Sequence, residues 1–301
     1  MVPWLIMSVD APKVTRTDDI VLPFALEGGG VRGRILRLGD AADRAIAHHG
    51  YEEAVTSLLG ETVALAALFG TSLKFEGTVT VQTGSDGAVR TLVADFATPG
   101  TVRGVASLSD EKRGATLLGK GSFAVTIDPD AASERYQGVV DLGPSLTATA
   151  LRYFEQSEQI PTALRVAVGQ VHVPGAKRPQ WRAGGILVQR MPGEGGIAPM
   201  PGDEDDWTRV KLLVSTIGDD ELIDPLLTPE RLAWRLFHED AVRVFPAQPI
   251  RFGCRCSRER LVSALKGYDA GTLAELAVDG RIVAACEFCG TSYELDPANL
   301  S

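Results

Sequence analysis

The stretch Cys254-Arg255-Cys256 is followed further along the chain by Cys286-Glu287-Phe288-Cys289, and these two motifs contain all 4 cysteines of the protein. Each motif lies beside a glycine, Gly253 or Gly290, that favours a turn. Thiolates at C-x-C and C-x-x-C spacing can converge on one tetrahedral soft-metal ion, for which zinc is the preferred metal. The sequence therefore predicts one zinc ion per chain, bound by Cys254, Cys256, Cys286 and Cys289.

Other interpretations of the cysteines stay open at this point. A zinc site can be purely structural, with no switching role. Structural disulfides are disfavoured because we find no secretion signal and cytosolic thiols stay reduced. Both spacings also let neighbouring thiols oxidise to each other, so zinc release and disulfide formation are available as one linked reaction. Such a site can report the redox state.

The composition describes a protein with a well-filled core. The chain has 301 residues, of which 45% are hydrophobic, enough for about two domains. The apolar stretch at residues 1–7 has no basic flank, and no run approaches the roughly 18 apolar residues of a membrane helix. We therefore expect a cytoplasmic protein with no membrane partner.

The negative charge is concentrated in one segment. Residues 1–192 hold 19 basic and 20 acidic side chains, residues 193–250 hold 5 and 12, and residues 251–301 hold 6 and 7. Nearly all of the net charge of −9 therefore lies in the middle segment. Phosphates would be repelled by it, which argues against a nucleic-acid partner and against a nucleic-acid-binding zinc ribbon.

Strand and helix signals are partly segregated along residues 18–192, after a loose leader at residues 1–17. This arrangement predicts an α+β domain with a mainly antiparallel sheet and packed helices. Pro23 places the first strand near a sheet edge. Strands are expected at residues 20–26, 34–38, 74–82, 89–96, 101–108, 122–128, 136–141, 164–172 and 183–190, and helices at residues 41–49, 51–70 and 146–158.

A Pro- and Gly-rich stretch at residues 192–201 marks the end of the first domain and the start of an acidic helical linker, residues 193–250. Its helices are too short and too acidic to be stable alone, so their apolar side chains must lie on another surface. The last segment, residues 251–301, is a small zinc domain in which Ser257 caps one helix and Thr272 to Glu275 form a capping box. The apolar face of the first linker helix carries Trp207, Val210, Val214 and Ile217.

The glycine run Gly28-Gly29-Gly30, with Asp86-Gly87, is similar to motifs of patatin-like lipases. No G-x-S-x-G is present, so a hydrolase of that class would lack its nucleophile. A bulged turn between two strands is the default interpretation.

The chain resembles the heat shock protein 33 family, the redox-regulated holdase chaperones also called 33 kDa chaperonins. The similarity extends from about Asp18 onward. It is strongest at Cys254–Arg260, Ala264–Lys266 and Cys286–Gly290. Supporting matches lie at Leu73–Gly77, Arg103–Ala106, Glu134–Val140, Tyr153–Thr162 and Trp234–Glu239. The glycine run at Gly28–Gly30 departs from the pattern expected of the family, which affects only that loop.

The resemblance implies a non-enzymatic chaperone of the oxidative stress response. In this family a zinc domain beside the linker keeps the linker docked as long as the cysteines are reduced. Oxidation expels zinc, pairs neighbouring cysteines in redox-active disulfides, and unfolds the linker, and the activated protein, usually a dimer, binds unfolding clients without ATP. The cysteines of this chain would then be both zinc ligands and redox-active thiols, with Trp207, Val210, Val214 and Ile217 as linker-docking and client-binding residues. A structural zinc ribbon that binds nucleic acid or protein, or a patatin-like hydrolase, is the alternative.

Overall fold

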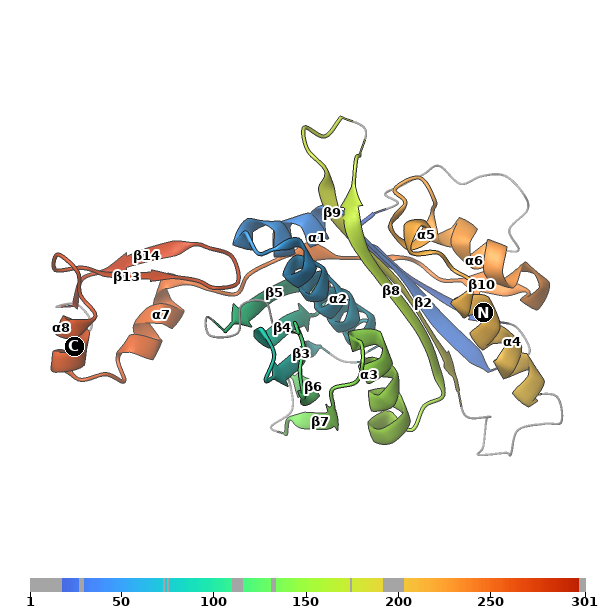
Figure 1. The fold of residues 1–301 in the computed structure, drawn as a ribbon, viewed down its shortest axis with the longest axis horizontal. Helices are drawn as coiled ribbons and strands as arrows, with labels where there is room; N and C mark the ends of the chain where they lie inside the picture. The colour runs from blue at the N-terminus through green and yellow to red at the C-terminus, as the bar shows by residue number, and fades with distance from the viewer. Residues whose placement is uncertain are drawn as a thin grey trace, which may run out of the picture.

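The computed structural model describes residues 18–26, 30–72, 74, 76–109, 116–130, 134–173, 175–191 and 203–297. The leader at residues 1–17, Gly28 and Gly29 of the glycine run, and the connection at residues 193–201 lie outside this part of the chain. The described residues have the α+β class that the sequence predicts (Figure 1).

The strands form two six-stranded sheets instead of the single sheet that the sequence suggests, because strands from both ends of the first domain pair with each other. We call them sheet A and sheet B. Sheet A has the order β10-β1-β2-β9-β8, with β11 also on β1: β1 Ile20–Leu26, β2 Val31–Leu38, β8 Thr162–Val171, β9 Gln180–Arg190, β10 Val242–Val244 and β11 Gln248–Pro249. Sheet B has the order β12-β5-β4-β3-β6-β7: β3 Gly77–Ser85, β4 Val89–Ala97, β5 Thr101–Leu108, β6 Gly121–Pro129, β7 Tyr136–Asp141 and β12 Arg251–Phe252.

All pairings within these sheets are antiparallel except that of β12 with β5, which is parallel. The proline-containing strand β1 lies next to the edge, as expected. Its outer neighbours are two short strands: β10 pairs with Phe24–Leu26, and β11 pairs with Ile20 and Val21. Pro23 falls between these two pairings, where its missing N–H costs no ladder hydrogen bond.

Helix α2 (Glu53–Gly70) lies between the two sheets and contacts strands of both (Figure 1). Its apolar residues form the largest core cluster together with α1 (Asp40–Ile46) and α3 (Leu146–Tyr153). A 3-10 turn (Ala47–His49) extends α1 and a π turn (Phe154–Glu158) extends α3. By length and composition alone, α2 could cross a membrane, but it is buried as a core helix. Its 18 residues reach a mean hydropathy of 1.3, and 72% of that window is buried inside the protein.

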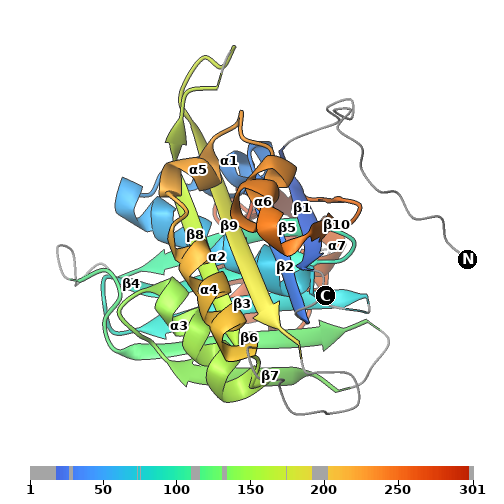
Figure 2. The ribbon, with the colours of Figure 1, turned by 90° about the vertical axis from the view of Figure 1, so that its right-hand side faces the viewer.

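Three short helices of the acidic segment cover the opposite face of sheet A, which we call the linker face (Figure 2). They are α4 (Asp203–Ser215), α5 (Asp219–Ile223) and α6 (Pro229–Phe237), followed by a 3-10 turn (His238–Asp240). Thr228 caps α6 by accepting a hydrogen bond from the N–H of Arg231 at 3.2 Å. The side chains of Trp207, Val210, Val214 and Ile217 are buried in one cluster with Ile35, Ile186 and Val188 of the sheet.

The backbone of α5 rests directly on β9. A Cβ atom at Gly184 would overlap the carbonyl oxygen of Leu222, so only glycine allows this approach.

The C-terminal segment forms a small separate unit with its own cluster of four buried side chains, Leu265, Leu273, Ile282 and Leu295. It contains α7 (Arg258–Leu265), α8 (Ala270–Glu275) and the hairpin of β13 (Ile282–Ala285) and β14 (Ser292–Leu295). Ser257 caps α7 as predicted. The capping box at Thr272 was wrong: α8 begins earlier, and Asp269 accepts the N–H of Thr272 at 3.0 Å.

This unit projects from one end of the molecule, whereas α4, α5 and α6 lie at the other (Figure 1). The expectation that it lies beside the linker helices was therefore wrong. The two are connected along the chain by β10, β11 and β12, which are built into both sheets.

Candidate metal and redox centre

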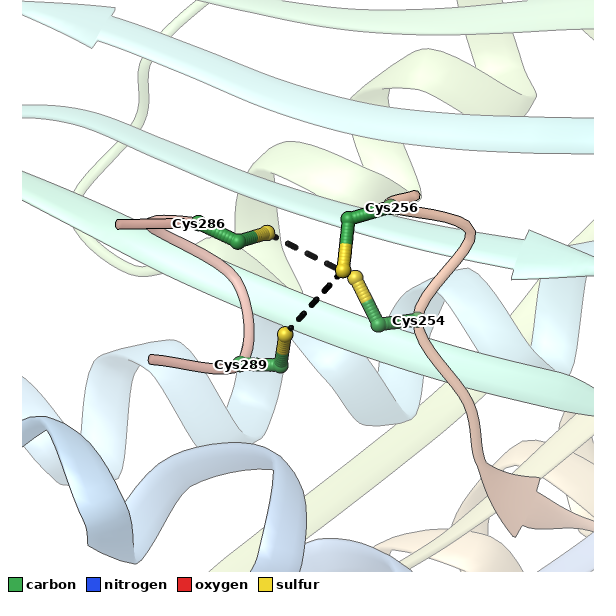
Figure 3. Close-up of side chains that lie close together, drawn as sticks. All are labelled: Cys254, Cys256, Cys286 and Cys289. Atoms are coloured by element: carbon green, nitrogen blue, oxygen red, sulfur yellow. Dashed lines mark hydrogen bonds between the residues drawn. The ribbon is translucent and has the colours of Figure 1, made fainter. Parts of the chain in front are cut away.

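The side chains of Cys254, Cys256, Cys286 and Cys289 converge from two loops (Figure 3). Their Sγ atoms all lie within 4.8 Å of one another. Two contacts join the different motifs: Cys254 Sγ lies 3.6 Å from Cys286 Sγ, and Cys256 Sγ lies 3.4 Å from Cys289 Sγ. A tetrahedral ion with Zn–S bonds of about 2.3 Å needs sulfur–sulfur edges of about 3.8 Å. The four sulfurs are therefore placed to hold one metal ion.

A tight turn prepares the second motif for this role. The N–H groups of Cys289 and Gly290 donate to the carbonyl oxygen of Cys286 at 3.3 and 2.8 Å, and the N–H of Cys286 donates to the carbonyl oxygen of Thr291 at 2.9 Å. Gly290 has φ +69°, a conformation that glycine adopts without strain. The turn expected from this glycine in the sequence is thus present.

Polar neighbours make the four thiols unequal. Burial raises the pKa of the Cys286 thiol to about 12. Burial also acts to raise the pKa of Cys289, but hydrogen bonds with Thr291 outweigh it and bring that pKa down to about 7. The hydroxyl of Tyr293 donates to Cys256 Sγ at 3.2 Å. The hydrogen bonds from Thr291 and Tyr293 favour negative charge on Cys289 and Cys256, the form that a metal ligand and a redox-active thiol require, whereas burial of Cys286 opposes it.

An ionic cluster fixes this centre to sheet B. The buried carboxylate of Asp95 on β4 accepts hydrogen bonds from Arg103 of β5 at 2.6 Å and from Arg255, between the first two cysteines, at 3.1 Å. Thr80 donates to its second oxygen at 2.7 Å. Arg255 also donates to the hydroxyl of Thr78 at 2.8 Å. One carboxylate therefore binds an arginine from each side of the interface.

Arg103 also contacts the centre itself. Its guanidinium lies 4.0 Å from the ring centroid of Phe288, inside the C-x-x-C motif, and donates to Cys254 Sγ at 3.7 Å. Removing negative charge from this sulfur would weaken the contact. The arrangement links the chemical state of the cysteines to their attachment on sheet B.

Sequence reasoning found the cysteines but missed this cluster. Asp95 is an acid inside the apolar run of a strand, which is the one local signal that it needs a partner. The partner comes from another domain, and no local pattern identifies it. The apolar residues Trp207, Val210, Val214 and Ile217 belong to a different place, under α4 at the far end of the molecule.

Fold and site together define an α+β protein with a four-thiol centre in a separate C-terminal unit. The family model described as "Hsp33 protein" matches residues 19–296. The 33 kDa chaperonin of Caulobacter vibrioides is 43% identical over 300 residues, covering 95% of this chain and 98% of the relative. That of Sodalis glossinidius is 35% identical over 279 residues, covering 91% and 90%.

A solved structure shares the fold. The crystal structure of the 33 kDa chaperonin from Thermotoga maritima superposes with a TM-score of 0.75 at 22% identity, covering 94% of this chain and 96% of the other. The chain belongs to the Hsp33 family, and its function is that of a chaperone, not of an enzyme.

Changing Asp95→Asn should loosen the C-terminal unit, because the amide cannot neutralise two guanidinium groups. We expect a cost of about 1–3 kcal/mol. Two amides report the attachment: the N–H of Arg251 donates to Gly100 and that of Gly253 to Val102. In the reduced protein their hydrogen exchange should become about tenfold faster, with the metal content unchanged.

The matched control is Asp128→Asn, which removes an exposed ion pair with Arg135 on the same sheet. This control should leave the hydrogen-exchange rates of both amides unchanged. Equal exchange in the Asp95→Asn variant and the parent would show that the ionic cluster does not hold the unit in place.

Proposed function

We propose that this chain is a redox-regulated holdase, which binds unfolding proteins without ATP after its cysteines are oxidised and zinc is released. The observation that supports it most is the position of the four thiols: all lie in one metal-binding geometry, and that geometry is attached to sheet B through Arg103 and Arg255. The proposed functional segments are the chaperone core at residues 18–192, the linker at 193–250 and the zinc and redox domain at 251–301.

The proposed redox step needs a two-electron oxidant such as a peroxide. Each pair of thiolates gives two electrons to the oxidant and forms one disulfide, and the sulfurs cease to be anionic ligands. When bound, the zinc ion would hold the two loops together, since the hairpin and the two small helices have little core of their own. Oxidation should therefore unfold or release this unit.

The path from the centre to the linker runs along the backbone. Cys254 follows β12 after a single residue, and β12 is held on β5 by two register positions. Upstream, β11 and β10 pair with β1, and β10 follows α6 closely. Loss of the attachment at Arg255 and Arg103 would free β12 and then expose the weakly paired β11 and β10. This route replaces the direct contact that the sequence suggested.

The linker helices are suited to such a release. They have 13, 5 and 9 residues, lengths at which an isolated helix is marginal in water. Their order comes from packing on the linker face, so a small loss of docking energy opens them. Opening would expose the apolar residues of the linker face and of α4, a surface of the kind that binds unfolded chains. By family resemblance we place the protein in the cytoplasm, where reducing conditions keep the thiols free in the resting state. After oxidation, the activated protein would be a homodimer.

The first prediction is that the reduced protein binds one zinc ion, with a contribution on the order of 10 kcal/mol to the folding of the C-terminal unit. Cys286→Ser removes one of four ligands and should abolish tight binding. Elemental analysis of freshly reduced parent and variant measures this. A parent without zinc, or a variant with the parent's metal content and affinity, would show that the site is not a zinc site.

The second prediction concerns the disulfides: oxidation should join Cys254 to Cys256 and Cys286 to Cys289. In the assembled site, sulfurs of different motifs also lie within contact distance. Once the ion leaves, however, only the chain connection keeps cysteines close, and it favours neighbours. Peptide mapping of the oxidised protein distinguishes disulfides within each motif from disulfides between the motifs. Bonds from Cys254 to Cys286 and from Cys256 to Cys289 would mean that oxidation takes place within the assembled site.

The third prediction tests activity. Oxidised protein should suppress the aggregation of a thermally unfolding client without nucleotide, and reduced protein should do so poorly. The variant Trp207→Asp with Val214→Asp buries two carboxylates under α4, which should cost about 3 kcal/mol or more and open the linker. It should therefore be partly active while reduced and zinc-bound.

The matched control places the same two charges on exposed linker positions, Leu212→Asp (61% exposed) and Leu226→Asp (80% exposed). This control should stay inactive when reduced. Linker release would be ruled out as the switch if hydrogen exchange shows an open linker in the buried variant and its activity still equals that of the reduced parent.

A further inference from the structure

The linker face of sheet A carries positive charge among its apolar residues. Side chains alternate along each strand, and the positions that share a face with Ile35, Ile186 and Val188 include four arginines. No strand of sheet A contains Asp or Glu. The arginines of the linker face are Arg37 on β2, Arg165 on β8, and Arg182 and Arg190 on β9.

Two of these arginines pair with carboxylates of the linker. Arg165 donates to Asp219 Oδ1 at 2.7 Å and to the carbonyl oxygen of Ser215, the last residue of α4, at 3.0 Å. Arg190 donates to Glu204 Oε1, in the first turn of α4, at 2.7 Å. Both ends of α4 are therefore anchored to the sheet by arginine.

The other two arginines bind the backbone at the end of α5. Arg37 donates to the carbonyl oxygens of Leu222 at 2.5 Å and Asp224 at 3.3 Å, and Arg182 donates to that of Ile223 at 2.7 Å. Their exposed fractions are 1% and 2%. Arg182 also pairs with the carboxylate of Asp18, whereas Arg37 Nε and Nη2 find no hydrogen-bond partner among the described residues. Burial lowers the pKa of Arg37 to about 10, which leaves it charged at neutral pH.

The segment that covers this face is complementary to it in charge. Residues 203–240 contain 11 Asp and Glu against 4 Lys and Arg, a net charge of −7. The same segment supplies the apolar side chains that fill the cluster over sheet A. The face is thus matched to a segment that is both apolar and acidic.

We propose that the linker face, when uncovered, selects client segments of the same chemistry: amphipathic stretches with several Asp or Glu side chains beside their apolar residues. This inference rests on the proposed function, because the linker must first be released. A client that buries the apolar residues of the face also removes water from the neighbouring guanidinium groups. Carboxylates restore their partners, whereas lysines add like-charge repulsion. Clients of net positive charge are bound more weakly at this face.

The test uses two synthetic peptides and the oxidised full-length chain. One peptide has the sequence of residues 204–223, and the other replaces each of its Asp and Glu by Asn and Gln, which keeps size and apolar residues. Fluorescence anisotropy of labelled peptides gives the two affinities. The acidic peptide should bind roughly tenfold more tightly, from two ion pairs of about two- to fivefold each. The ratio of the two affinities should decrease as the salt concentration is raised, because salt screens the ion pairs.

Arginine variants show whether the preference for the acidic peptide comes from the linker face. Arg165→Gln with Arg190→Gln should reduce the affinity for the acidic peptide to nearly that of the amide peptide. The matched control, Arg135→Gln with Arg152→Gln, removes two arginines that lie away from the linker face and should keep the preference. Unchanged preference in the first variant would show that these arginines do not select clients.

Parallel aggregation assays separate this inference from the proposed function. If oxidised protein suppresses aggregation but binds both peptides equally, charge selection is wrong and the holdase function stands. If it neither suppresses aggregation nor binds either peptide, both are wrong.

Discussion

Sheet A is apolar on both faces, and the rest of the structure depends on covering each of them. One face is covered by α2, which lies between the sheets and is itself buried in the largest core cluster. The other is covered by α4, α5 and α6, and within the described part of the chain no second layer lies behind these helices. The first cover is part of the folding core, whereas the second is held by a single interface. A chaperone that must expose a surface on demand needs this asymmetry between a permanent and a removable cover.

In the proposed function, the thiol centre controls the cover formed by α4, α5 and α6 from a distance. The thiol centre and the linker helices lie at opposite ends of the molecule, so the signal must pass through residues 242–253, which add β10, β11 and β12 to the sheets. These strands have three, two and two residues, and each is held by few ladder hydrogen bonds. Such a connection can transmit release without a rigid lever. Once Arg255 leaves Asp95 and β12 leaves β5, the short pairings of β10 and β11 with β1 hold much of the remaining segment.

The sequence reveals the parts of this structure whose signals are local. The strands of sheet B are separated by turn residues at short intervals, and their bounds agree with the structure to within a few residues. The cysteine motifs carry their own geometry, so the centre could be found from spacing alone. The division into two sheets could not be predicted, because it depends on the pairing of β2 with β9, for example Ile35 with Ile186, far along the chain. Asp95 and Arg255 likewise become partners only when the domains meet. The misplaced start of α8 has a simpler cause: Asp269 and Thr272 are both good capping residues, and the first of them forms the cap.

The polar contacts of the linker face explain why its docking can be both specific and weak. A purely apolar interface of this extent would gain stability with every buried side chain and would resist opening. Here, Arg37 is withdrawn from water while two of its nitrogens find no partner among the residues the structure describes, and a buried donor left unsatisfied costs about 1–3 kcal/mol. The bonds from Arg37 and Arg182 to the end of α5 fix the position of that short helix, since its final carbonyls would otherwise lack partners. The docked linker is therefore held in one register, while the cost of the buried donors offsets part of the free energy gained by apolar burial. With this smaller net docking free energy, a change at the distant thiol centre could open the linker.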